Sequence, residues 1–304
     1  MFDDVLVLLD GSTDSARAIG PAAAIARYLN VTLRAVGFHE GPTSHYLATA
    51  INDQIQGRGD IRLEVTIEPL VKSVGESLSG VLADHQTSLI CMSTHGRGRS
   101  AALVGSGASE VLDVAQCPIL LVGPGYGASS FRCHGPLIVA VNGSDDSRTI
   151  LSAAQAFGSF FDYDLEIATV VDPKASSQFE QLQASWGEGD STAIESAGVR
   201  NAALATEAET NAPVSFTVLY GANPATALTS YATETHATLL AMATQNPTGM
   251  ERVVSGSTLA DVARSAPCPI LAIKAPKGGP APKGGPAPKG GPAPKGGPAP
   301  ESDY

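Results

Sequence analysis

The chain contains the same pattern twice, and this repeat limits the folds that it can adopt. Residues 5–26, VLVLLDGSTDSARAIGPAAAIA, are repeated at 137–158 as LIVAVNGSDDSRTILSAAQAFG, and residues 105–122 are repeated at 256–273. Each half opens on an apolar run followed by Asp or Asn, Gly and Ser, and closes on Cys-Pro and a second apolar run. The repeat predicts two related domains, and 304 residues accommodate two domains of roughly 150 residues.

Short apolar runs alternate with longer helical patterns in both halves. This alternation is typical of βα units whose parallel sheet is buried on both faces. We therefore expect an α/β fold with two Rossmann-like, doubly wound domains, each a five-stranded, mostly parallel sheet flanked by helices. The expected strands are 4–9, 31–38, 62–69, 87–93 and 118–122, then 137–142, 164–171, 214–220, 238–243 and 269–273, and the expected helices of the first half are 13–29, 45–55, 73–85 and 107–115.

The expected domain boundaries follow the repeat. Domain 1 covers 1–123, a Gly-, Pro- and Ser-rich linker covers 124–136, domain 2 covers 137–274, and a tail covers 275–304. The tail repeats APKGGP four times, and this composition predicts disorder because it cannot bury a core. We interpret it as a flexible spacer, with a docking segment for an acidic or polyproline-reading partner as the alternative.

The second half carries a net insertion of nineteen residues near 172–212, which includes the only tryptophan, Trp186. Two interpretations remain open for this insertion. It can form a surface flap or an extended helix, or it can form a loop that binds a partner or covers a site, because long loops often have a function.

Charge and composition exclude several classes of function. The net charge of -11 and the pI near 4.9 disfavour binding to nucleic acid and to anionic membranes. No apolar run approaches the roughly 18 residues of a membrane span, and the first residues lack the features of a signal peptide, so we expect a cytoplasmic protein. The spacing of the histidines and cysteines does not match a metal site. We expect Cys117 and Cys268 to be buried thiols, whereas Cys133, in the linker, is the better candidate for an exposed thiol.

The candidate binding residues follow the expected strands at their carboxyl ends, where open parallel sheets bind ligands. Asp10, Gly11 and Ser12 come directly after the first strand. The carboxylate can accept hydrogen bonds from a sugar hydroxyl or a base amine, and Ser12 also fits the N-cap of a helix.

A second group follows the fourth strand, where the sequence STHGRGRS spans 93–100. Gly105, Ser106 and Gly107 then open a helix. Glycines let the backbone approach a phosphate, and the free amides at a helix N-terminus favour an anion. Together the two groups predict a nucleotide cradle.

Four signatures, VLVLLDGSTDSARAI, MSTHGRGR, GSGASEVL and CPILLV, occur in this order, and residues 1–274 as a whole resemble a tandem universal stress protein. ATP-binding members of that family show Gly, two residues, Gly, nine residues, Gly and then Ser or Thr. The resemblance implies that Asp10 lies at the adenosine end, that the backbone near Phe38 lies beside the adenine, and that the ribose and phosphates are held by Gly96, Gly105 and Ser106. The chain departs from the pattern because Ser93 replaces the first glycine and eight residues separate the next two.

The second copy of the cradle differs more from the family pattern. Asn142 replaces Asp10, and Ala243 and Asn246 replace Ser93 and Gly96, although Gly256 and Ser257 remain. Arg97, in the first copy only, either helps to hold phosphates or is a solvated loop charge. We therefore expect domain 1 to bind nucleotide better than domain 2.

These observations favour an ATP-binding sensor or regulator of the stress response, with Mg²⁺ carried by the nucleotide phosphates. The sequence offers no activated nucleophile paired with a base, so binding is better supported than catalysis. Two alternatives remain, a stress-linked interaction module that binds no nucleotide, and a slow ATPase or self-phosphorylating enzyme. The resemblance also implies that CPILLV pairs with CPILAI to form an internal pseudo-dimer, which could associate further into a homo-oligomer.

Overall fold

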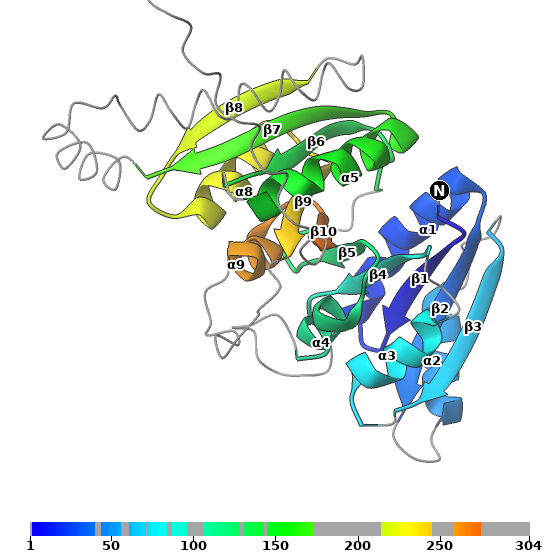
Figure 1. Ribbon diagram of the computed structural model, residues 1–304. Coiled ribbons are helices and arrows are strands. Elements are labelled where there is room, and N and C mark those ends of the chain that lie inside the picture. The colour runs from blue at the N-terminus through cyan, green and yellow to red at the C-terminus, as the bar shows by residue number, and fades with distance from the viewer. Residues whose placement is uncertain are drawn as a thin grey trace, which may run out of the picture.

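The structure, a computed structural model, describes residues 2–39, 44–55, 61–70, 72–83, 87–95, 106–127, 131–142, 145–172, 214–244 and 258–274. Their strands form one ten-stranded sheet in the order β3-β2-β1-β4-β5-β10-β9-β6-β7-β8 (Figure 1). The first half supplies β1 (Asp4–Leu9), β2 (Thr32–His39), β3 (Leu63–Pro69), β4 (Leu89–Ser93) and β5 (Ile119–Val122). The second half supplies β6 (Gly135–Ala140), β7 (Tyr163–Val171), β8 (Ser215–Tyr220), β9 (Leu239–Thr244) and β10 (Ile270–Lys274).

Each half is doubly wound, as expected from the sequence. Neighbouring strands within a half are parallel, and β1 has β2 on one side and β4 on the other. The second half has the same arrangement around β6. The chain moves outward from β1 to β3 and then returns past β1 to β4, so the switch point of the first half lies between β1 and β4.

The two halves meet where β5 pairs with β10 (Figure 1). This pair is antiparallel, with Leu271 opposite Leu120, and it confirms the expected pairing of the last strands. Because all strands within a half are parallel, the first five strands run opposite to the second five. The carboxyl edges of the two halves therefore lie on opposite sides of the sheet.

Helices cover both faces of the sheet. One face carries η1 (Ser15–Ala18), α1 (Ile19–Leu29), α2 (Ser44–Ile55) and α5 (Asp145–Phe161), and the other carries α3 (Val74–Leu82), α4 (Ser106–Val114), α8 (Pro224–Glu234) and α9 (Thr258–Ser265). In β1, Val5 and Val7 face the first group while Leu6 faces the second. Every residue of β1 is buried, which explains the continuous apolar run that follows Asp4 in this strand.

The first helix differs from its expected form, because the segment predicted as a helix over 13–29 begins with the 3₁₀ turn η1. The amide of Ile19 donates to Ala16, three residues earlier. Pro21 explains the tighter turn, since proline has no N–H to donate to Arg17 four residues before it.

Several features predicted from the sequence fall largely outside the described residues. These are Trp186 with nearly all of the insertion at 172–212, and the tail at 275–304. Among the helices that the structure describes, none has the length and apolarity required to cross a membrane.

Residues at the ends of β5 and β10 contact the last helix of the opposite half. Gly123, after β5, lies so close to α9 that an added Cβ would overlap the carbonyl oxygen of Ala263. At the equivalent end of β10, the Lys274 Nζ donates to the carbonyl oxygens of Asp113 (2.6 Å) and Ala115 (3.3 Å) at the C-terminus of α4. These carbonyls lack donors within the helix, and a cation is favourable there. Each half therefore packs against the last helix of the other, and Lys274 also caps the end of α4.

The four cysteines are free and buried. Burial of Cys117 and Cys268 was expected, but the expectation of an exposed thiol at Cys133 is wrong, since only 7% of Cys133 is exposed. The linker packs against the core at this point. The hydroxyl of Tyr163 donates to the carbonyl oxygen of Arg132 (3.0 Å), and Cys133 belongs to the same apolar cluster as Tyr163.

Replacing Gly123 with alanine should destabilise the protein by about 2 kcal/mol or more, because the new methyl group overlaps backbone that cannot easily move. The matched control is Gly127→Ala, where the added carbon meets open space, and its effect should stay within about 0.5 kcal/mol. Urea unfolding followed by circular dichroism measures both. Equal midpoints for the two variants would show that the contact with α9 is not tight.

Burial raises the pKa of the Cys133 thiol from 9.0 to about 11, because the interior disfavours the thiolate. Between these values the unfolded chain loses the proton while the folded chain keeps it, so stability falls as the pH rises through this window. The loss approaches about 1.4 kcal/mol per pH unit for one thiol. In Cys133→Ala, the decline of the free energy of unfolding between pH 9 and 11 should be shallower by up to this amount. Urea titrations with reductant across that range measure the slopes, and identical slopes would contradict the prediction.

Candidate functional site

The candidate site lies at the carboxyl edge of the first half. Strands β1 and β4 are neighbours, with Leu8 opposite Met92, so the chain leaves both strands at the same edge. Asp10 follows β1, and Ser93 is the last residue of β4. This is the switch point, where doubly wound sheets bind their ligands.

The loop after β1 is held by its own hydrogen bonds. The amide of Ser12 donates to Oδ1 of Asp10 (2.9 Å), and Gly11 between them has a φ of 78°, which glycine adopts most readily. The hydroxyl of Ser12 accepts from the amide of Ser15 (3.1 Å), as a helix-capping serine does, and the Ser15 hydroxyl donates to the carbonyl oxygen of Ser12 (3.0 Å). The loop therefore presents Asp10 from a defined turn.

A residue that the sequence did not suggest holds the same loop from α2. The Nε2 of Gln54 donates to the carbonyl oxygens of Gly11 (3.1 Å) and Ser12 (3.2 Å). Its Oε1 is buried and has no partner among the residues described. Helical spacing was the available signal, because Gln54 lies seven residues after the buried Leu47 and so falls on the inward face of α2.

The end of β4 is tied to the end of β5. The hydroxyl of Ser93 donates to the carbonyl oxygen of Val122 (3.2 Å) and accepts from the amide of His95 (3.3 Å), and the amide of Thr94 also donates to Val122 (3.0 Å). Both side chains are buried. The Ser93 hydroxyl thus fixes the edge of the sheet, and a ligand would meet the backbone that follows it.

The N-terminus of α4 follows β4 in the chain. Ser106 and Gly107 are its first two residues, and an added Cβ on Gly107 would meet only an ordinary contact with Val74 at 3.7 Å. The start of α3 is tied to this helix, because the amide of Gly75 donates to Oε2 of Glu110 (3.0 Å). The first amides of α4 have no partners within the helix, and such amides can bind an anion.

The remaining predicted residues are distributed as follows. Phe38 lies near the end of β2, partly buried against the core beneath α3 and α4. Asn142 follows β6 and is exposed at the opposite edge of the sheet, so it does not join the first cradle. Five predicted residues lie outside the described part of the chain: Gly96, Arg97, Gly105, Gly256 and Ser257.

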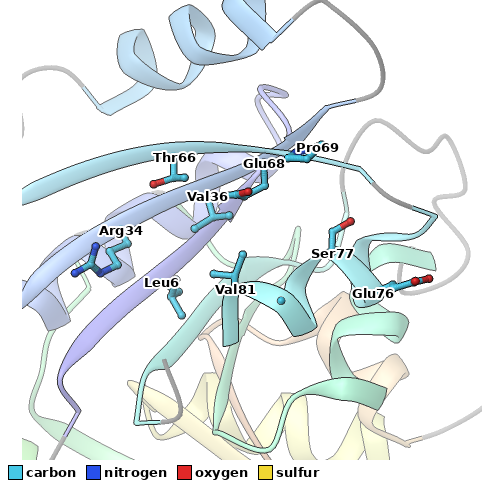
Figure 2. A pocket seen from close by; sticks show the side chains of 10 residues that line it. Leu6, Arg34, Val36, Thr66, Glu68, Pro69, Glu76, Ser77 and Val81 are labelled. Atoms are coloured by element: carbon cyan, nitrogen blue, oxygen red, sulfur yellow. The ribbon is translucent and has the colours of Figure 1, made fainter. Parts of the chain in front are cut away.

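The first half also has a groove of about 390 Å³ on the sheet face beside α3, and the residues of the Asp10 turn do not line it (Figure 2). Its lining comes from β1, β2, β3 and α3. The residues include Leu6, Arg34, Val36, Thr66, Glu68 and Val81. No sequence motif indicated this groove, because residues from four separate segments form it.

Comparison with known families accounts for the repeat. The model of the universal stress protein family matches residues 1–123 and again residues 135–274. The chain belongs to the universal stress protein family. No curated protein matches it in sequence.

Solved structures show the same fold as this universal stress protein. A functionally unknown protein from Pseudomonas aeruginosa PAO1 is 16% identical, with a TM-score of 0.61, over 90% of this chain and 93% of its own. A universal stress protein from Archaeoglobus fulgidus DSM 4304 is 17% identical, with a TM-score of 0.60, over 91% of this chain and 100% of its own. Both likenesses extend over the two halves, so the tandem arrangement is shared.

Replacing Gln54 with alanine should destabilise the protein by about 1–2 kcal/mol, since the carbonyl oxygens of Gly11 and Ser12 lose their donor. The control is Gln116→Ala, because the exposed Gln116 donates only to Val114 nearby and its loss should cost less than about 0.5 kcal/mol. Urea unfolding measures both variants. A Gln54→Ala protein as stable as the control would show that the loop does not depend on α2.

Proposed function

We propose that this universal stress protein binds ATP at the carboxyl edge of its first half and acts as a nucleotide-dependent regulator. The observation that carries the proposal is that the rigid Asp10 turn and the end of β4, which leads to α4, lie at the switch point of the sheet. One element suits the sugar and base of a nucleotide, and the other suits its phosphates.

Asp10 would bind the adenosine end. A carboxylate has about four lone-pair positions, so Asp10 can keep the hydrogen bond from Ser12 and still accept one from a ribose hydroxyl or a base amine. Because Gln54 and Ser15 hold the loop in place, little conformational entropy is lost when the ligand binds.

The amides of Ser106 and Gly107 at the start of α4 would bind the phosphates, with Mg²⁺ carried by the phosphate oxygens. Gly96 and Gly105 would let the backbone approach, and Arg97 would add positive charge in a chain of net charge -11. The second half has an asparagine at the position of Asp10, so it would bind more weakly.

A regulatory role is favoured over rapid hydrolysis. Near the site, the Thr94 hydroxyl lies 2.8 Å from Nδ1 of His95, a pairing that could activate a nucleophile. Thr94 is only 1% exposed, however, so a substrate cannot reach its hydroxyl. The pair stabilises the strand end rather than performing chemistry.

The first test is calorimetric titration of the full chain with ATP and Mg²⁺. We expect saturable binding, and Asp10→Asn should weaken it about tenfold by removing a charge-assisted hydrogen bond. The matched control is the reciprocal change Asn142→Asp at the opposite edge, which should leave the first site intact. Absence of heat and of thermal stabilisation at about millimolar ATP would contradict the proposal and favour the interaction module.

The second test compares the two cradles. Gly105→Val should abolish binding because the side chain occupies space that the phosphates need, whereas Gly256→Val, at the repeated position, should have a smaller effect. Calorimetric titration of both variants with ATP shows which half holds the principal nucleotide site. The reverse order of effects would move the principal site to the second half.

A further inference from the structure

The groove beside α3 has an apolar middle with polar groups around it. Figure 2 shows Leu6, Val36 and Val81 converging on its centre, with Arg34 on one side of them. Next to Val81, an added Cβ on Gly80 would meet open space. The volume of about 390 Å³ lies within the range of small-molecule sites.

The repeat identifies the residues that occupy the same place in the second half. Val5 is opposite Leu89, and its equivalent Leu137 is opposite Leu239, so this part of the chain repeats at an offset of 150 residues. The helix starts agree, because Ser73 caps α3 by accepting from the amide of Glu76, and Asn223 caps α8 by accepting from the amide of Thr226. Tyr231 therefore corresponds to Val81.

The strand positions follow in the same way. Leu6 is opposite Arg34, and its equivalent Ile138 is opposite Glu166. On the next strand of each half, Arg34 is opposite Glu64 and Glu166 is opposite Ser215. Glu166 therefore takes the place of Arg34, and Thr217 takes the place of Thr66.

In the second half, a side chain of the protein fills the corresponding space. The hydroxyl of Tyr231 reaches from α8 to β7 and donates to Oε1 of Glu166 (2.6 Å), and Thr217 also interacts with it. The ring packs against the core beneath α8 and α9. Burial and the bond to Glu166 raise the pKa of this phenol, so it is neutral at pH 7. Val81 is too short to cross the first groove in this way.

The polar end of the first groove carries a hydrogen-bond donor, Arg34, where the second half has the acceptor Glu166. Arg34 donates from Nε to Asp4 (2.7 Å) and from Nη1 to Glu64, while its Nη2 has no partner among the described residues. An oxygen at this end must therefore accept a hydrogen bond. Because Asp4, Glu64 and the lining residue Glu68 already supply negative charge nearby, a neutral oxygen fits better than a carboxylate.

We propose that the groove binds a small neutral phenol, whose ring lies on Leu6, Val36 and Val81 and whose oxygen accepts a hydrogen bond from Arg34. The ligand would occupy the space that Tyr231 fills in the second half. The groove lies on the sheet face and shares no lining residue with the Asp10 turn. The proposal therefore does not rest on the proposed function.

The test uses the full chain and p-cresol, which reproduces the tyrosine side chain. Saturation-transfer NMR should show binding with a Kd of about 1 mM, the affinity expected for a ligand of this size. Val81→Tyr, which introduces the residue of the second half, should weaken binding at least about tenfold. If that variant does not fold by circular dichroism, Gly80→Leu provides a second way to fill the groove. Absence of saturable binding by the wild type up to about 10 mM, or undiminished binding by a folded filled variant, would overturn the proposal.

Two comparisons test the chemistry. 4-Methylbenzoate should bind more weakly than p-cresol because of the surrounding carboxylates, and tighter binding would overturn the assignment of a neutral phenol. Tyr231→Val should open a second groove, so that p-cresol raises the Tm of this variant more than that of the wild type. An equal rise in both proteins would show that Tyr231 is not a stand-in for the ligand.

Discussion

The antiparallel pairing of β5 with β10 is the interaction on which the rest of the structure depends. In each half this strand would otherwise be an edge strand with unpaired backbone groups. All four residues of β5 are buried, so an open edge would also expose apolar side chains to water. Pairing gives one continuous sheet, and the clusters on both of its faces include residues from both halves, such as Leu120 with Leu271 and Ile119 with Ile270. The two repeats therefore share their cores.

Most of the strand pattern could be predicted from the sequence, because parallel strands covered on both faces need continuous apolar runs such as β1. Asp10 and Asn142 could also be matched from the sequence, because each directly follows one of these apolar runs. The misses depend on partners far along the chain. Gln54 reaches a loop 42 residues earlier, and the burial of Cys133 depends on a cluster that includes Tyr163. The helical spacing of α2 indicates only that Gln54 faces inward, not which loop it reaches, and the burial of Cys133 leaves no local pattern.

The two halves show how one backbone supports different chemistry. Asp10 and Asn142 follow equivalent strands, yet only one carries a charge. Arg34 and Glu166 have opposite charges at one register position, and Val81 and Tyr231 differ in whether the side chain spans the adjacent space. A duplicated domain can thus close a hollow with its own side chain in one copy and leave it open in the other, while the surrounding strands remain the same.

The contacts across the β5–β10 pair also determine which halves can pair with each other. Two second halves could not pair in this way, because Lys274 would then stand where the surface of α9 leaves room only for glycine. Two first halves could pair, but the end of α4 would face Gly123 and lose the ammonium group that Lys274 provides. Only a first half paired with a second half makes both contacts, that of Gly123 with α9 and that of Lys274 with the end of α4. The chain therefore favours pairing a first half with a second half over pairing two like halves.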